Sequence, residues 1–343
     1  MGFVGGFLEV PSGQYSDDAH SSAVLDPASP GGRLPNVYMT TASPVLRGSD
    51  ATLSPSGAAL TYDAAFARWL PVPKASVSPD GARYAYVDAI AGVPLPTSRV
   101  HIVDVQTGAD HIVVFPGAGL AQRTQYLAGV VAFSKQGIYL SLYGSNEGSG
   151  LDTGKLWLMD PDRGTIRKVS DQSSSEQGWL VTDDYAWTFA STLEASPVPS
   201  DGGSIQPSAN RLVRLDLKTG QLTLWWVDTD YEPVSSPGAA TVLGVMGVDS
   251  AGSPIVEGVG EVGGGTNYTT VFDVWVIKAP NQAVPLDVSA ANGGSSTIRT
   301  SDGAMTDSAG TWIAVNDILF LYGTDRTLRK VVDGPYSPSG SCV

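Results

Sequence analysis

The chain has 343 residues, of which 42% are hydrophobic and 16% charged, so it holds enough apolar side chains to build a core. This composition excludes a chain that is disordered throughout. The net charge of −14 and an isoelectric point near 4.5 exclude a surface for nucleic acid, since phosphate binding needs an excess of Lys and Arg. No apolar run is long enough for membrane insertion.

The N-terminal residues Met1–Val4 lack the basic and apolar regions of a signal peptide. Elsewhere charge is sparse, and Gly, with 40 residues, and Pro, with 23, are abundant. We therefore expect a secreted, periplasmic or cell-surface protein whose signal peptide is absent from this chain. The alternative is a cytoplasmic protein. Cys342 is the single cysteine, so no disulfide is expected within the chain.

A short hairpin turn recurs between apolar segments. Each copy begins with Ser or Asp, which can bond to the turn backbone, and ends with Gly, which accepts a positive φ. Turns of this kind join neighbouring antiparallel strands. The copies are Ser54–Gly57, Ser78–Gly81, Ser134–Gly137, Asp249–Gly252 and Asp307–Gly310.

A second repeat consists of an apolar strand that ends in Asp and enters a turn closed by Gly. It comprises Val100–Asp104, Leu156–Asp160 and Leu212–Asp216, with turn glycines at Gly108, Gly164 and Gly220. The interval between the first two aspartates equals the interval between the second two. Val274–Ile277 and Leu319–Tyr322 are further copies without the Asp. Four strands in a repeat of about 50 residues are typical of a propeller blade.

The repeats predict an all-β fold with one domain, a single β-propeller of six blades with four antiparallel strands each. A seven-bladed ring is the alternative. Five full blades are expected over residues 75–334. Residues 1–74 are expected to form the N-terminal segment that completes the closing blade, and residues 335–343 a C-terminal tail.

The turn Ser78–Gly81 and the strand Ala82–Tyr86 that follows it resemble the repeat of TolB-like propellers, also called WD40-like or PD40. The resemblance is clear in this blade and degenerate in the others. It implies the propeller fold and leaves the function open. The group includes periplasmic interaction proteins and the non-catalytic propellers of some peptidases.

Several residues that could carry chemistry are better explained by structure. Gly258–Gly263 matches the dinucleotide fingerprint, but a strand rather than a helix follows it, so we interpret it as a loop. His20, His101 and His111 lack the spacing of paired zinc ligands, and His101 is expected to be an ordinary strand residue. The sequence contains no G-x-S-x-G motif, the turn that carries the nucleophilic serine of α/β-hydrolases, so we do not expect serine peptidase activity. The eight Trp favour core packing, with Trp225 and Trp226 on opposite faces of one strand.

Long connections are expected on the face opposite the short turns, and long loops on a rigid scaffold commonly bind ligands. Our candidate ligand-binding residues there are Arg123, Tyr126, Glu147, Asp152, Asp228, Asp230, Tyr231, Glu232 and Tyr268. We expect a non-enzymatic binding or scaffold module for a protein, a carbohydrate or a cationic ligand. No cofactor is predicted, although Ca²⁺ would suit these carboxylates. The alternative is a metal-dependent lactonase- or lyase-like enzyme with its site at the central channel.

Overall fold

The computed structural model describes residues 4–7, 21–25, 38–41, 61–63, 68–70, 72–90, 97–114, 126–144, 154–172, 174, 178–190, 211–228, 241–264, 267–291, 304–315 and 318–333. Strands account for almost all regular structure in these ranges. The two exceptions are short 3-10 turns, η1 (Lys74–Ser76) and η2 (Ser289–Ala291). The predicted all-β class is confirmed.

Five antiparallel sheets follow one another from residue 83 onward. Sheet I is β6 (Arg83–Ile90), β7 (Thr97–Asp104) and β8 (Asp110–Val114), and a bridge between Val77 and Tyr84 extends it. Sheet II is β9 (Tyr126–Ser134), β10 (Gly137–Gly144), β11 (Leu156–Met159) and β12 (Ile166–Lys168). Sheet III is β13 (Leu180–Val181), β14 (Tyr185–Ala190), β15 (Arg211–Asp216) and β16 (Leu222–Val227).

Sheet IV is β17 (Thr241–Val248), β18 (Pro254–Gly264), β19 (Asn267–Ala279) and β20 (Gln282–Leu286). Sheet V is β21 (Ala304–Asp307), β22 (Gly310–Val315), β23 (Ile318–Gly323) and β24 (Leu328–Asp333). The N-terminal strands form two smaller sheets. One is β1 (Val4–Phe7), β2 (Ser21–Leu25) and β3 (Tyr38–Thr41), and the other is β4 (Thr61–Asp63) with β5 (Arg68–Leu70).

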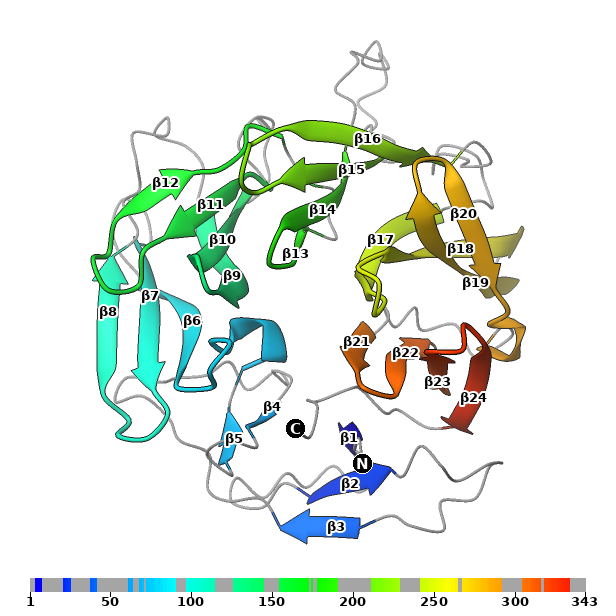
Figure 1. Cartoon of the computed structure of the whole chain (residues 1–343), viewed down its shortest axis with the longest axis horizontal. Helices are drawn as coiled ribbons and strands as arrows, with labels where there is room; N and C mark the ends of the chain where they lie inside the picture. Colours follow the sequence, from blue (N-terminus) through cyan, green and yellow to red (C-terminus); the bar gives the residue numbers. More distant parts are fainter. Residues whose placement is uncertain are drawn as a thin grey trace.

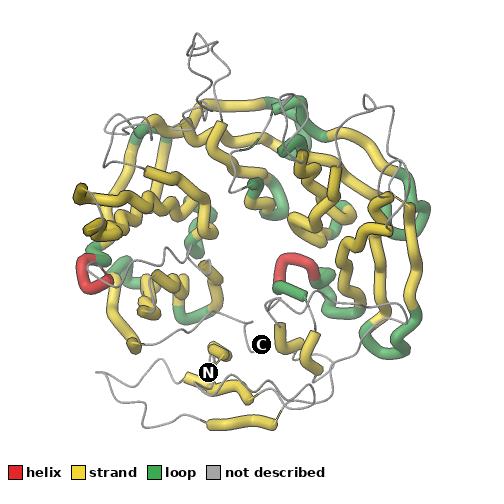
Figure 2. The backbone as a smooth tube through the Cα atoms, turned by 180° about the vertical axis from the view of Figure 1, so that it is seen from behind, coloured by secondary structure: helices red, strands yellow, loops and turns green. Residues whose placement is uncertain are grey.

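The sheets are arranged around a common centre in sequence order (Figure 1). Strands β9, β13, β17 and β21 lie nearest the centre, and β8, β12, β16, β20 and β24 lie on the outside. The two N-terminal sheets occupy the arc between sheets V and I, and Figure 2 shows the same order from behind. Among the strands described, β1–β3 pair only with one another, and β24 pairs only with β23.

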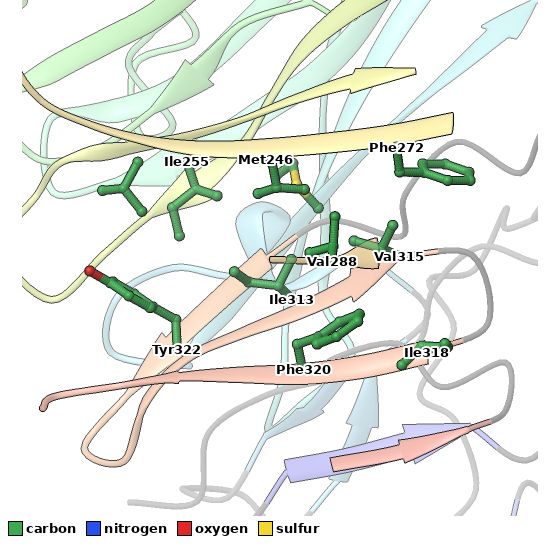
Figure 3. Packing of buried hydrophobic residues seen from close by; sticks show 11 residues of the cluster. Met246, Ile255, Phe272, Val288, Ile313, Val315, Ile318, Phe320 and Tyr322 are labelled. Carbon is green, nitrogen blue, oxygen red and sulfur yellow. The ribbon is translucent and has the colours of Figure 1, made fainter. Parts of the chain in front are cut away.

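Four clusters of the core are each made by facing sides of two consecutive sheets. Alternate residues of a strand point to opposite faces, so one sheet can contribute to the clusters on both of its sides. Between sheets IV and V, for example, Met246, Ile255 and Phe272 pack against Ile313 and Phe320 (Figure 3). Equivalent clusters join sheets I and II, II and III, and III and IV.

The turn chemistry predicted from the sequence is confirmed where the structure describes it. Gly81, Gly137, Gly252 and Gly310 have φ of 72°, 136°, 78° and 141°. Gly57 lies outside the described residues. At Gly137 a Cβ would lie 2.4 Å from the carbonyl oxygen of Met159, so glycine is required by space as well as by backbone angle.

Two expectations are wrong. Gly258–Gly263 is not a loop but part of strand β18, paired along its length with β19. A Cβ on Gly258 would lie 3.1 Å from the ring of Trp275, a tight contact that favours glycine at this position of the strand. Trp225 and Trp226 do not face opposite sides, because a β-bulge between β15 and β16 falls at Trp225. Both rings join the cluster between sheets III and IV.

Candidate functional site

The sheets have two unlike ends. At one end, which we call the short-turn face, lie all the tight turns of the two sequence repeats that the structure describes. Strands at this end are joined by Ser78–Gly81, Asp104–Gly108, Ser134–Gly137, Asp160–Gly164, Asp216–Gly220, Asp249–Gly252 and Asp307–Gly310. The opposite end is the long-loop face. There β6 connects to β7 in sheet I, the second strand connects to the third in sheets II to V, and the chain passes to the next sheet.

The turn aspartates of the second repeat are occupied by their own turns. The Asp104 carboxylate accepts hydrogen bonds from the Thr107 hydroxyl and backbone N–H, both at 2.7 Å. Asp160 and Asp216 accept backbone N–H bonds from their turns at 2.7 to 3.1 Å. These hydrogen bonds hold the pKa of all three carboxyl groups below the usual aspartate value. Such carboxylates stabilise turns and are poorly placed to bind a ligand.

Polar contacts join neighbouring sheets on the short-turn face. Arg83 of sheet I forms a salt bridge with Asp162 of sheet II at 2.7 Å. Lys135 of sheet II lies 3.9 Å from the Asp183 carboxylate of sheet III, and Gln136 donates to the Asp183 carbonyl at 3.2 Å. The short-turn ends of sheets I, II and III therefore lie side by side.

Three of the nine predicted binding residues fall in the part of the chain that the structure describes, and all three lie at the long-loop face. Tyr126 is the first residue of β9, Asp228 directly follows β16, and Tyr268 is the second residue of β19. They come from sheets II, III and IV. The other six, Arg123, Glu147, Asp152, Asp230, Tyr231 and Glu232, lie outside the described residues.

The β18–β19 hairpin extends beyond its own sheet at this face. The pairing of β17 with β18 reaches Gly260, and the pairing of β20 with β19 reaches Val274. Beyond those points, Glu261–Gly264 pair only with Asn267–Thr270. The result is a two-stranded arm on the long-loop face, with Tyr268 opposite Gly263. The sequence placed Tyr268 at the edge of a loop, whereas it is part of this arm.

Sequence reasoning missed a buried polar pair in sheet I. Nδ1 of His101 lies 2.8 Å from Oδ2 of Asp110, and the two side chains are 0% and 4% exposed. The His101 ring stacks on Tyr86 with centroids 4.5 Å apart and planes 8° apart. The only signal was that a His and an Asp flank one tight turn on adjacent strands. Because both side chains are buried, the pair is better placed to stabilise the sheet than to contact a substrate.

Sheet III contains a second feature that the sequence did not reveal. The Cζ atom of Arg214 lies 4.4 Å from the ring centre of Tyr185 and 4.1 Å from that of Trp225. Trp187 is a third aromatic neighbour at 5.9 Å. Arginine stacks well on aromatic faces because its planar cation is attracted to the ring quadrupole and is weakly hydrated.

Within the described ranges, no three His, Cys, Asp or Glu side chains come together in a way that could hold a metal ion. The described helices include none that is long and apolar enough to cross a membrane.

No protein-family model matches the chain, and no curated protein matches it significantly.

Proposed function

We propose that the chain is a six-bladed β-propeller of TolB-like type that acts outside the cytoplasm as a non-enzymatic binding or scaffold module. Its partner, a protein, a carbohydrate or a cationic ligand, binds at the long-loop face. Sheets I to V supply five blades, and the N-terminal segment, with β1–β3, supplies the sixth. A seven-bladed ring requires β4–β5 to belong to a separate blade.

The observation that carries this proposal is the contrast between the two faces. On the short-turn face, turn aspartates are bonded within their turns and neighbouring sheets are joined to each other. On the other face the β18–β19 arm extends beyond its sheet. Strand β14 ends and β15 begins at this face, and residues 191–210 separate them in the sequence, whereas two to five residues suffice to join adjacent strands. Recognition on a rigid scaffold is commonly carried by such segments.

The test begins with the full chain immobilised and exposed to the extracellular fraction of its native source. Proteins retained on it are identified by mass spectrometry, and their affinity is then measured with purified components. Three variants are compared with the unaltered chain: residues 191–210 replaced by a short Gly-Ser linker, Asp228→Ala, and Lys218→Ala as a matched control on the short-turn face.

We expect the linker variant to keep its melting temperature and to lose affinity, and the Lys218 control to bind as the unaltered chain does. Asp228→Ala should weaken a cationic partner in particular. Unchanged affinity in the linker variant, or a loss confined to the control, would contradict the placement. A metal assay of the purified protein addresses the enzymatic alternative, since a stoichiometric divalent ion needed for turnover would contradict a non-enzymatic module.

A further inference from the structure

We propose that Arg214, Tyr185 and Trp225 form a binding site for a carboxylate group. The site lies on the side of sheet III that faces sheet IV, and its residues belong to the cluster shared by those two sheets. Tyr185 directly follows the turn at the short-turn face, so this site is separate from the long-loop face. The inference does not depend on the function proposed above.

The guanidinium group is oriented by its neighbours. Arg214 lies on β15, and Tyr185 and Trp225 come from the two flanking strands, β14 and β16. Trp225 is itself anchored, because its indole N–H points to the carbonyl of Ile277 at 3.5 Å and its own carbonyl accepts the N–H of Asn281 at 2.8 Å. A stacked arginine loses little further side-chain entropy when it binds a ligand.

In the part of the chain that the structure describes, no acceptor bonds to the N–H groups of Arg214. Among the residues described, it forms neither a hydrogen bond nor a salt bridge, and its Nε is buried without a partner. Arg83, Arg163 and Arg329, in contrast, each lie within 4 Å of an aspartate. Hydrogen bonds from the Thr219 backbone lower the pKa of Asp216 most, and the charge of Arg214 contributes to the lowering. That carboxylate already accepts the backbone N–H groups of its own turn.

A planar guanidinium fork matches a carboxylate, which it binds through two parallel hydrogen bonds. The three side chains are each half-buried, so the site is open to solvent at its edge and sheltered by aromatic surface behind it. Because the net charge of −14 repels acids at long range, affinity must come from short-range contacts. The carboxylate can come from an acidic side chain or from a chain terminus of a partner.

The experiment titrates the full chain with three probes at constant ionic strength. One is a Gly-Glu-Gly peptide blocked at both ends, the second is an acetylated triglycine with a free C-terminal carboxylate, and the third is inorganic phosphate. The readouts are tryptophan fluorescence and the ¹⁵Nε resonances of the arginines. The variants are Arg214→Gln and Arg214→Lys, with Arg211→Gln as the control, since Arg211 is exposed on the same strand.

We expect at least one peptide to saturate the fluorescence change and to shift the Arg214 Nε resonance. Affinity should fall roughly tenfold in Arg214→Gln and in Arg214→Lys, as the loss of a charge-assisted bond predicts, and stay unchanged in Arg211→Gln. Which peptide binds identifies the source of the carboxylate. The proposal is overturned if neither peptide saturates, if Arg214→Lys binds as the unaltered chain does, or if phosphate alone binds. Even if the variants fold poorly, the titration of the unaltered chain tests the proposal, because a bound carboxylate should shift the Arg214 Nε resonance.

Discussion

Separating the buried His101–Asp110 pair should cost a large part of the stability of the protein. Replacing Asp110 by Ala leaves the His101 ring, which is 0% exposed, without its carboxylate. Removing one partner of a buried charged or hydrogen-bonded pair costs about 3 kcal/mol of unfolding free energy. His101→Phe keeps an aromatic ring on Tyr86 but leaves a nearly buried carboxylate whose Oδ1 already lacks a partner among the described residues, so its cost should be similar.

A double variant distinguishes the pair from two independent contributions. His101→Phe combined with Asp110→Val removes both polar partners and leaves neither one buried alone, so its loss should be well below the sum of the two single losses. Urea unfolding followed by circular dichroism and by tryptophan fluorescence provides the free energies, with a constant slope as the check on two-state behaviour. Additive losses, or a loss below about 1 kcal/mol for Asp110→Ala, would refute the reasoning.

Three further predictions concern the short-turn face. The turn aspartates of the second repeat, Asp104, Asp160 and Asp216, have lowered pKa values in the folded state. The stabilisation that they provide is therefore complete above the pKa of the unfolded state, and it is lost as the pH falls through the pKa of the folded state. The melting temperature should therefore drop between pH 5 and pH 2 (about the range in which lowered carboxyl groups titrate), and Asn at these positions should flatten the drop. Gly137→Ala should destabilise far more than Gly220→Ala in denaturant titrations, because its Cβ would meet the Met159 carbonyl whereas Gly220 has nothing within 4 Å. Arg83→Gln should cost less than about 1 kcal/mol, since its salt bridge to Asp162 is exposed, and a larger loss would contradict this.

The turns could be predicted from sequence because their requirements are local. A Gly at the end of a Ser- or Asp-initiated turn is required by the backbone angle of that residue itself, and the observed angles at Gly81 and Gly252 agree. The regular alternation of strands and turns was then enough to place Tyr126, Asp228 and Tyr268 at one end of the sheets.

The missed features depend on contacts between residues that are not adjacent in the chain. The run of glycines at Gly258–Gly263 suggested a loop when only the neighbouring residues were considered. At Gly258 the glycine is instead favoured by the Trp275 ring, which lies close to it on the next strand. The orientation of Trp225 follows from a bulge that exists only once β15 and β16 are paired. The His101–Asp110 and Arg214 clusters likewise depend on strand register, which composition and periodicity do not determine.

The serial packing of the sheets also has a consequence for how the chain folds. Each of sheets I to V is built from strands that follow one another in the sequence, so its pairing closes short stretches of chain at low entropic cost. Each cluster between sheets then joins consecutive units, and assembly can proceed stepwise as the chain leaves the ribosome. The cluster of Trp312, Leu319 and Leu321 lies on the side of sheet V away from sheet IV. In the proposed ring this cluster meets the N-terminal segment, whose residues are synthesised first and would find their partner last.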